Sequence, residues 1–131
     1  EALRRPERRR GLAVVISDFL GPIDWDRPLR AIGAHHELLA IEVLDPRDLE
    51  LPAIGDVRLA DAESGEIHDV VITEQVRIDF AAAAAAHQQQ VHRTIRACGG
   101  PVMTLRTDRD WVADTVRFIG GRRRGLAAGV G

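Results

Sequence analysis

The chain has 131 residues, 45% of them hydrophobic, which is enough for one domain with a real core. Eighteen basic and twenty acidic residues leave a net charge of −2, so the composition gives no reason to expect a nucleic-acid or acidic-membrane partner. The single cysteine excludes an internal disulfide and any cysteine-based metal cluster.

Several common enzyme signatures are missing from the sequence. All eighteen basic residues are arginine, and the chain has no lysine. This excludes a P-loop lysine, a Schiff-base lysine and the lysine-dependent serine hydrolases. The two serines, Ser17 and Ser64, do not lie in a Gly-x-Ser-x-Gly motif. No apolar run approaches the roughly 20 residues that span a bilayer, and no signal-peptide pattern is present, so we expect a cytoplasmic protein without a membrane partner.

The first predicted elements follow a charged lead-in over residues 1–10. Residues 12–17 predict a strand, because residues 12–16 are continuously apolar and mostly β-branched. Such a run is typical of a strand covered on both faces. Asp18 follows at the point where this strand leaves the sheet.

A helix and a second strand come next. Gly21-Pro22 predicts a turn, after which Asp24 or Asp26 is expected to cap a helix. Leu29 and Ile32 fall on the buried side of that helix. Residues 37–44 predict a strand that Asp45-Pro46 stops.

The remaining sequence predicts a hairpin, a long helix, a strand and a last helix. Residues 57–72 alternate apolar and polar around Gly65, which is typical of a half-exposed hairpin. Thr73 is expected to cap a helix that ends near Ala97, before Gly99-Gly100. Residues 101–106 predict a strand, and residues 107–111 cap a helix that should end at Gly120-Gly121. Residues 122–131 are expected to form a flexible tail.

This order predicts an α/β fold, a partial doubly wound sheet of the von Willebrand factor A or Rossmann-like kind. It should have about three parallel strands plus a β-hairpin, with helices on both faces. A doubly wound sheet usually has five or six strands, so one flank should be unfinished.

Candidate site residues cluster at the predicted carboxyl edge of the sheet, where doubly wound folds bind ligands. Asp18, Asp45 and Asp108 each follow a predicted parallel strand, and Asp24 and Trp25 lie in the loop after the first one. Asp45 and Asp108 also suit a turn and a helix cap. For Asp18 a ligand-related and a structural role stay equally open, because Asp24 offers a cap downstream.

Other candidates favour structural roles. His87 and His92 are five residues apart on a helix, where metal ligands need a spacing of three or four, so surface or boundary positions are expected. Cys98 closes the long helix, whose negative dipole end disfavours a thiolate, so a packed thiol is expected. Residues 81–86, all alanine, predict close packing of that helix on the sheet.

Motifs along nearly the whole chain resemble one bacterial family. They are Arg9-Arg-Gly-Leu-Ala-Val-Val-Ile-Ser-Asp18-Phe-Leu, Trp25, Leu39-Ala-Ile-Glu-Val-Leu-Asp-Pro-Arg47, Gly55-Asp-Val-Arg-Leu and Thr107-Asp-Arg-Asp-Trp111. In this order they are similar to the C-terminal half of the proteins called "domain of unknown function 58". The resemblance implies a von Willebrand factor A-like fold in residues 1–131. It also implies an adaptor role beside a MoxR-type AAA+ ATPase.

The resemblance further implies a metal-ion-dependent adhesion site, in which Mg²⁺ is held by three loops and takes an acidic side chain from a protein ligand. Asp18 matches the acid of the third loop. The Asp-x-Ser-x-Ser sequence of the first loop is not in this chain. We therefore expect an incomplete Mg²⁺ site here, with Mg²⁺ bound only in a longer parent domain.

Three functions remain from the sequence. The first is a non-enzymatic interaction domain, and the second is a structural module that forms a homodimer through an open sheet edge. The third is a Rossmann-like, metal-dependent hydrolase that uses Asp18. Such an enzyme would normally need a second acid at the position of Leu20 and a lysine, and the chain has neither.

Overall fold

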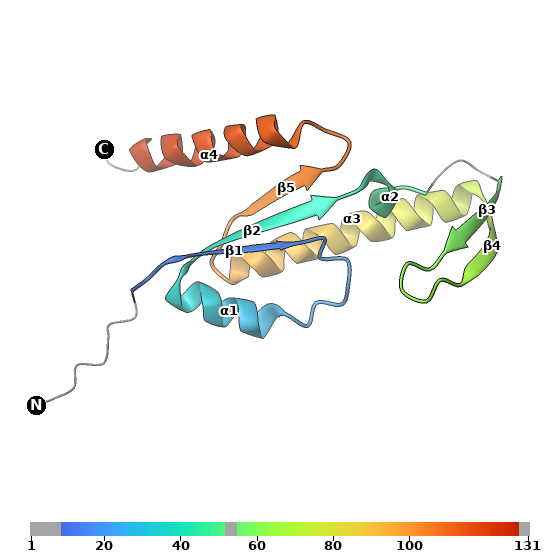
Figure 1. Ribbon diagram of the computed structural model, residues 1–131, viewed down its shortest axis with the longest axis horizontal. Helices are drawn as coiled ribbons and strands as arrows, with labels where there is room; N and C mark the ends of the chain where they lie inside the picture. Colours follow the sequence, from blue (N-terminus) through green and yellow to red (C-terminus); the bar gives the residue numbers. More distant parts are fainter. Residues whose placement is uncertain (1–8, 52–54, 129–131) are drawn as a thin grey trace, which may run out of the picture.

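Three parallel strands form the central sheet of the computed structural model, which describes residues 9–51 and 55–128 (Figure 1). The elements follow one another as β1 (Leu12–Ser17), α1 (Asp26–His35), β2 (Glu37–Leu44), α2 (Pro46–Leu49), β3 (Gly55–Ala60), β4 (Ile67–Ile72), α3 (Glu74–Ala97), β5 (Val102–Arg106) and α4 (Trp111–Ala128). The predicted α/β fold with an open sheet and a hairpin is confirmed; only the short helix α2 was not expected.

The strand order in the sheet is β1-β2-β5, and both pairs are parallel. Ser17 lies beside Glu42, and Glu42 lies beside Thr104, so these three residues form one row across the sheet. Strands β3 and β4 pair only with each other, as an antiparallel hairpin beyond the carboxyl end of the sheet. Within the described residues β1 therefore has one neighbouring strand and one free edge.

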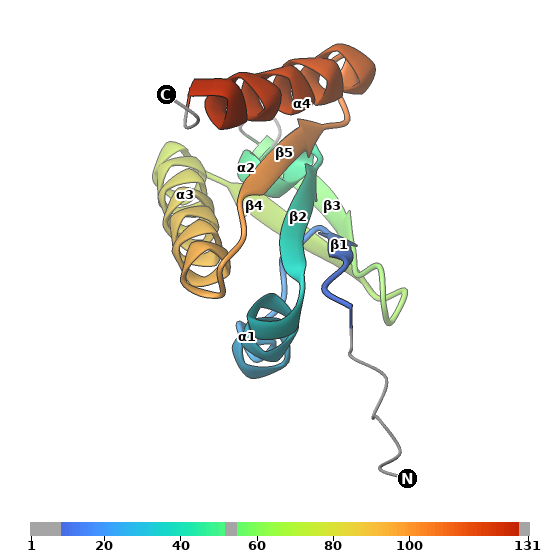
Figure 2. The same ribbon diagram turned by 90° about the vertical axis from the view of Figure 1, so that its left-hand side faces the viewer.

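The two faces of the sheet are covered unequally. Helices α1 and α3 lie on one face and α4 on the other, where it packs along β5 (Figure 2). Above β1 the α4 face is bare: Leu12, Val14 and Ile16 are 59%, 46% and 65% exposed. The expectation that this strand is covered on both faces is wrong for this chain, because no described element lies over that side of β1.

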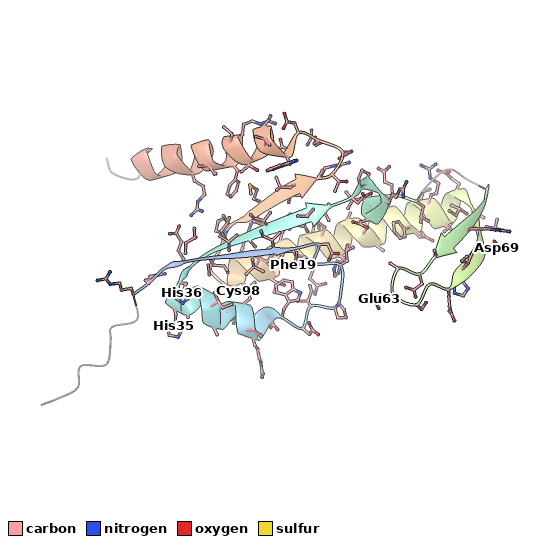
Figure 3. The ribbon with its side chains drawn as sticks, viewed as in Figure 1. Phe19, His35, His36, Glu63, Asp69 and Cys98 are labelled. Atoms are coloured by element: carbon pink, nitrogen blue, oxygen red, sulfur yellow. The ribbon has the colours of Figure 1, made fainter. Side chains whose placement is uncertain are left out.

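The core lies between the sheet and helices α1 and α3. Its buried side chains include Leu38 and Ala40 of β2, Leu29 of α1 and Val91 and Ile95 of α3. Figure 3 shows Phe19 and Cys98 among these interior side chains, whereas Glu63 and Asp69 project from the hairpin. Cys98 is packed as predicted, with its thiol 3.5 Å from the carbonyl oxygen of Asp26.

Helix α1 begins without the predicted cap. Trp25 occupies the N-cap position and makes no side-chain hydrogen bond there, while Asp26 is the first helical residue. Neither Asp24 nor Asp26 caps the helix through its carboxylate, so that prediction is wrong. The predicted buried side of the helix is confirmed, with Leu29 buried and Ile32 packed against the core.

The two halves of α3 differ in burial. Thr73 caps the helix as predicted, accepting a hydrogen bond from the backbone N–H of Val76 at 3.2 Å. The buried residues of the helix, Val91 and Ile95, lie in its last third. The alanine run is mostly exposed instead, with only Ala81 and Ala84 half-buried. The predicted tight packing of this run is therefore wrong for the described residues.

Helix α4 is longer than the sequence predicted. It continues through Gly120-Gly121 to Ala128, so the expected end at these glycines is wrong. The flexible tail over residues 122–131 stays a prediction, and residues 129–131 lie outside the described residues. Glycine lowers helix stability by only about 1 kcal/mol per residue, and it stops a helix when it adopts a positive φ. Among the described residues the positive-φ glycines are Gly55, Gly65 and Gly99. No helix in the described part of the chain is both long and apolar enough to cross a membrane.

Candidate functional site

The loop after β1 holds Asp18 in a fixed position. The hydroxyl of Ser17 accepts a hydrogen bond from the backbone N–H of Phe19 at 3.0 Å, and Oδ1 of Asp18 accepts one from Leu20 at 3.1 Å. These short bonds close two consecutive side-chain turns, a common use of Ser and Asp. The Asp18 side chain is exposed, so the loop presents its carboxylate to solvent.

Phe19 anchors this loop to the core. It has a φ of 52°, the only positive value at a described residue other than glycine, and such backbone strain persists only where the surroundings enforce it. Its side chain is 6% exposed and its ring lies 5.1 Å from the ring of Trp25. Its carbonyl oxygen lies 2.9 Å from Nε2 of His87 on α3. Contacts from Trp25, which directly precedes α1, and from His87 of α3 thus hold the loop in shape.

A shallow apolar hollow adjoins the loop. It has a volume of about 290 Å³ and is lined by Val15, Ser17, Phe19, Trp25, Pro28, Leu29 and Ile32. Trp25 is half-buried between this hollow and the core, and Asp24 beside it is exposed. The predicted neighbours of Asp18 therefore contribute an apolar wall and a second exposed acid.

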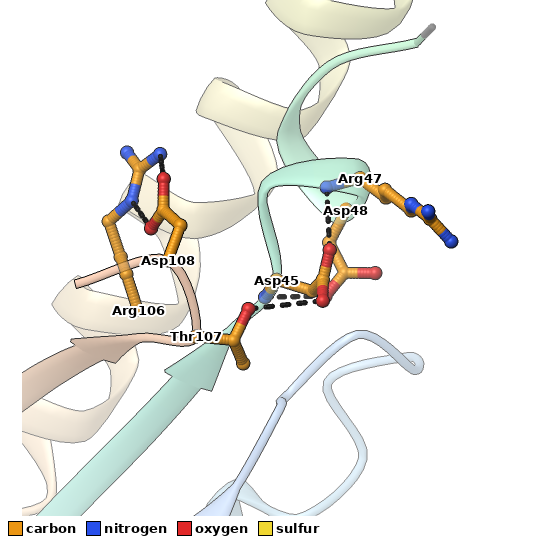
Figure 4. A network of polar contacts seen from close by, with 6 residues as sticks. All are labelled: Asp45, Arg47, Asp48, Arg106, Thr107 and Asp108. Atoms are coloured by element: carbon orange, nitrogen blue, oxygen red, sulfur yellow. Dashed lines mark hydrogen bonds and ion pairs between the residues drawn. The ribbon is translucent and has the colours of Figure 1, made fainter. Parts of the chain in front are cut away.

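Asp45 has a structural task at the carboxyl edge (Figure 4). It caps α2 by accepting from the backbone N–H of Arg47 at 2.9 Å, while Asp48 accepts from the N–H of Asp45 in return. Its other oxygen accepts from the hydroxyl of Thr107 at 3.0 Å, which joins the ends of β2 and β5. The N–H of Arg47, followed by the Thr107 hydroxyl, lowers the pKa of Asp45.

Asp108 is paired with a neighbouring arginine and does not cap the last helix. Both its oxygens accept from the Arg106 guanidinium at 3.0 Å, and these bonds lower the pKa of Asp108 (Figure 4). The cap of α4 is Asp110, whose Oδ1 accepts from the backbone N–H groups of Val112 and Ala113. The predicted capping region is right, but the capping residue is Asp110.

The predicted acids do not form a metal centre by themselves. Within the described ranges no group of three or more His, Cys, Asp or Glu side chains lies close enough to hold a metal ion. Mg²⁺ needs near-octahedral oxygen coordination, and the Asp18 loop offers one exposed carboxylate. The residues present therefore do not fit a complete Mg²⁺ site.

Sequence reasoning missed a buried polar cluster centred on Glu42. This residue is 1% exposed, and its Oε1 lies 2.7 Å from Nε2 of His92, 3.2 Å from the Gln88 amide and 3.0 Å from the Thr104 hydroxyl. The cluster joins α3 to β2 and β5. The available signal was an acid inside an apolar strand together with Gln88 and His92, which are four residues apart on one helix face.

The histidines are more engaged than expected. His87 contacts the Phe19 carbonyl and His92 contacts Glu42. His36 accepts a bond from the backbone N–H of Gly11 at 3.2 Å, and His68 pairs with Glu66 on the exposed hairpin. The predicted surface or boundary positions are confirmed, since His68 is exposed and both histidines of α3 are half-buried.

Comparison with known proteins gives relatives without a described activity. An uncharacterized protein of Mycobacterium avium is 69% identical over 129 residues, which cover 98% of this chain and 76% of the relative. Uncharacterized proteins of Mycobacterium tuberculosis and Mycobacterium bovis are 68% identical over the same length, but the chain spans only 41% of each. No solved structure matches significantly.

The family assignment comes from both comparisons. The model of the family described as "Protein of unknown function DUF58" matches residues 1–90, more than half of the chain. The M. avium relative supports it, since the chain covers more than two thirds of that protein at high identity. The chain belongs to the DUF58 family.

Proposed function

We propose that this chain belongs to a non-enzymatic protein-interaction domain that contacts its partner through the carboxyl edge of the sheet, with Asp18 at the centre. The observation that carries the proposal is the anchored loop of residues 17–20, in which a positive-φ Phe19 is buried and Asp18 is exposed. A carboxylate held in this way loses little conformational freedom on binding, which lowers the entropic cost of recognition.

The other acids of this edge support the choice of Asp18. Asp45 and Asp108 are engaged by Thr107 and Arg106, whereas Asp18 accepts a bond from the backbone of Leu20 and its side chain faces solvent. The apolar hollow beside Trp25 offers a place for an apolar side chain of the partner. A charged contact next to an apolar pocket is a common arrangement in protein interfaces.

The partner we propose is a MoxR-type AAA+ ATPase, on the basis of family membership, with both proteins in the cytoplasm. Mg²⁺ and an acidic protein ligand belong to this proposal only for a longer parent domain. There Asp18 would supply one oxygen ligand and the remaining ligands would come from outside the described residues. The M. tuberculosis relative, of which this chain spans 41%, has the length for such a domain.

An enzymatic role for Asp18 has less support. Phosphoryl hydrolysis at such a strand end needs further acid and amine groups near the nucleophile, and the position two residues after Asp18 is Leu20. The Asp18 carboxylate accepts a hydrogen bond from the backbone N–H of Leu20, which is neither an acid nor an amine. The loop therefore fits recognition better than group transfer.

Calorimetric titration of the chain into a MoxR-type ATPase from the same genome, with and without Mg²⁺, tests the proposal. Asp18→Asn keeps the shape of the side chain and removes its charge, and we expect about tenfold weaker binding or more, which corresponds to about 1.4 kcal/mol. Asp69→Asn on the hairpin removes one exposed acid far from the loop and is the matched control. Unchanged affinity of the Asp18→Asn and Asp18→Arg variants would overturn the role of Asp18, and absence of binding by the unchanged chain would overturn the partner.

A further inference from the structure

The free edge of β1 carries unpaired backbone groups. The carbonyl oxygen of Gly11 accepts from the N–H of Glu37 at 2.8 Å, so Gly11 directs its backbone groups toward β2. In a parallel ladder this direction alternates along the strand. The N–H and C=O groups of Leu12, Val14 and Ile16 therefore point away from β2, toward the free edge. Their side chains lie on the bare face and are exposed.

We propose that a second copy of this chain pairs with that edge, antiparallel, with Val14 opposite Val14. The pairing would join two three-stranded sheets into one six-stranded sheet around a twofold axis perpendicular to it. This inference rests on the free edge and shares one residue, Asp18, with the proposed function.

The face pattern restricts the possible registers. A twofold axis perpendicular to the sheet keeps each residue on the same face in both copies, and directly opposite residues share a face. Residues of even number must then lie opposite residues of even number. With Val14 on the axis, Leu12 lies opposite Ile16 of the second copy, and each opposed pair exchanges two backbone hydrogen bonds.

Charge selects this register among those that the face pattern allows. Arg10 and Asp18 are exposed and lie just outside the two ends of β1. With Val14 on the axis, extending the ladder to these flanking residues would bring Arg10 opposite Asp18 of the second copy, at both ends of the interface. A shift by two residues in one direction places Leu12 opposite Asp18, and a shift in the other places Arg10 opposite Ile16. Parallel pairing in equal register places Arg10 beside Arg10. Opposite charges therefore meet only in the antiparallel register with Val14 opposite Val14. This charge match is the reason to propose a second copy as the partner of the β1 edge.

Cysteine crosslinking tests the register in solution, in a Cys98→Ala background that removes the buried native thiol. Val14→Cys should form a covalent dimer on mild oxidation, because opposite Cα atoms lie about 5.5 Å apart, within the range of a disulfide. Leu12→Cys is the matched control: its two copies are offset by four residues, about 13 Å, and should not crosslink. Equal crosslinking at both positions would overturn the register.

Charge reversal tests the same arrangement without new thiols. Light scattering should show a dimer for the unchanged chain, and Arg10→Asp should weaken it about tenfold by placing like charges opposite each other twice. The double variant Arg10→Asp with Asp18→Arg should restore the dimer. Arg9→Asp is the control, because Arg9 lies on the other face and does not oppose Asp18. Circular dichroism would show that each variant is folded.

Two outcomes would overturn the proposal. A chain that stays monomeric at high concentration would leave the β1 edge for another occupant, such as the additional polypeptide of the M. tuberculosis relative. A dimer that is insensitive to Arg10→Asp and to crosslinking at residue 14 would place the interface elsewhere. Asp18 takes part in both proposals, so they are separated by the variants that leave Asp18 unchanged. Crosslinking at residue 14 and Arg10→Asp report on the dimer, and titration of the ATPase reports on the proposed partner.

Discussion

Strands β1 and β2 are neighbours of similar composition with different surroundings. Both are rich in Val, Ile, Leu and Ala, although two-sided cover was predicted only for β1. On the face toward α4, Leu39, Ile41 and Val43 of β2 are half-buried, whereas Leu12, Val14 and Ile16 of β1 are exposed. The apolar pattern therefore indicates that a strand can be buried on both faces. Whether it is buried in this chain depends on the helices and strands that pack against it.

The largest expected effect on the free energy of unfolding comes from a leucine-to-alanine substitution made in β2 and, for comparison, in β1. Leu38→Ala removes a side chain that is 1% exposed and leaves a cavity, so the free energy of unfolding should fall by about 2–5 kcal/mol. Leu12→Ala removes one that is 59% exposed and should change it by less than about 0.5 kcal/mol. Urea unfolding should be measured below the concentration at which the chain self-associates. Equal losses would show that β1 is covered in solution.

The buried cluster extends the comparison along one row of the sheet, where Ser17 of β1 lies beside Glu42 of β2. Glu42→Ala leaves Gln88, His92 and Thr104 without their acceptor, so we expect a loss of about 2–3 kcal/mol in the free energy of unfolding.

Glu66→Ala is the control for this prediction. It removes an acid that also pairs with a histidine, but on the exposed hairpin, and it should have almost no effect. Denaturant unfolding measures both variants. A loss of less than about 0.5 kcal/mol for Glu42→Ala would show that the cluster contributes little to the folded state.

A smaller effect is expected where α1 approaches the end of α3. A Cβ atom on Gly33 would lie 2.0 Å from the carbonyl oxygen of Cys98, so Gly33→Ala must shift the helix and should cost about 1–3 kcal/mol. Gly21→Ala is the control, since no described atom lies within 4 Å of the added methyl group. Thermal unfolding of the two variants measures the difference. A stable Gly33→Ala variant would show that this contact is looser than described.

The sequence predicts the local structure well where its signals are local. The strands at 12–17 and 37–44, the Thr73 cap and the buried side of α1 follow from patterns within a few residues. The misses depend on distant partners. The exposure of the alanine run depends on what packs beside it, and the engagement of His92 depends on Glu42, fifty positions away. Helix α4 passes through Gly120-Gly121 because these glycines keep helical φ values, which their identity does not determine.

The same division holds for the candidate site. The position of Asp18, Asp45 and Asp108 at strand ends was predictable from the strand pattern. Their different engagement was not, because it depends on Thr107 and Arg106, whose side chains meet the acids only after β2 and β5 have paired. The strand pattern thus predicts which acids lie at the carboxyl edge of the sheet. The contacts made after folding determine which of these acids remain exposed to a partner.

The smallest expected effect concerns the pH dependence of Asp45. Its folded-state pKa is lowered by the N–H of Arg47 and the hydroxyl of Thr107. A carboxyl group with a lowered folded-state pKa stabilises the fold at pH values above its ordinary pKa, and this contribution is lost as the pH falls through the folded-state pKa. The stabilisation should therefore be present at neutral pH and disappear below about pH 4.

Thr107→Val isolates one cause of that shift. It removes the hydroxyl donor and keeps the Arg47 N–H, so the pKa of Asp45 should rise part of the way toward its ordinary value. The pKa of Asp108 should stay low, because Arg106 is its main cause. Carbon-detected NMR titration of the side-chain carboxyl groups measures both values in one sample. Thr115→Val, whose hydroxyl bonds to the carbonyl of Trp111 in its own helix, should move neither. An unmoved Asp45 in the Thr107→Val variant would mean that the bond joining the ends of β2 and β5 does not hold in solution, and Asp45 would then be as free to meet a partner as Asp18.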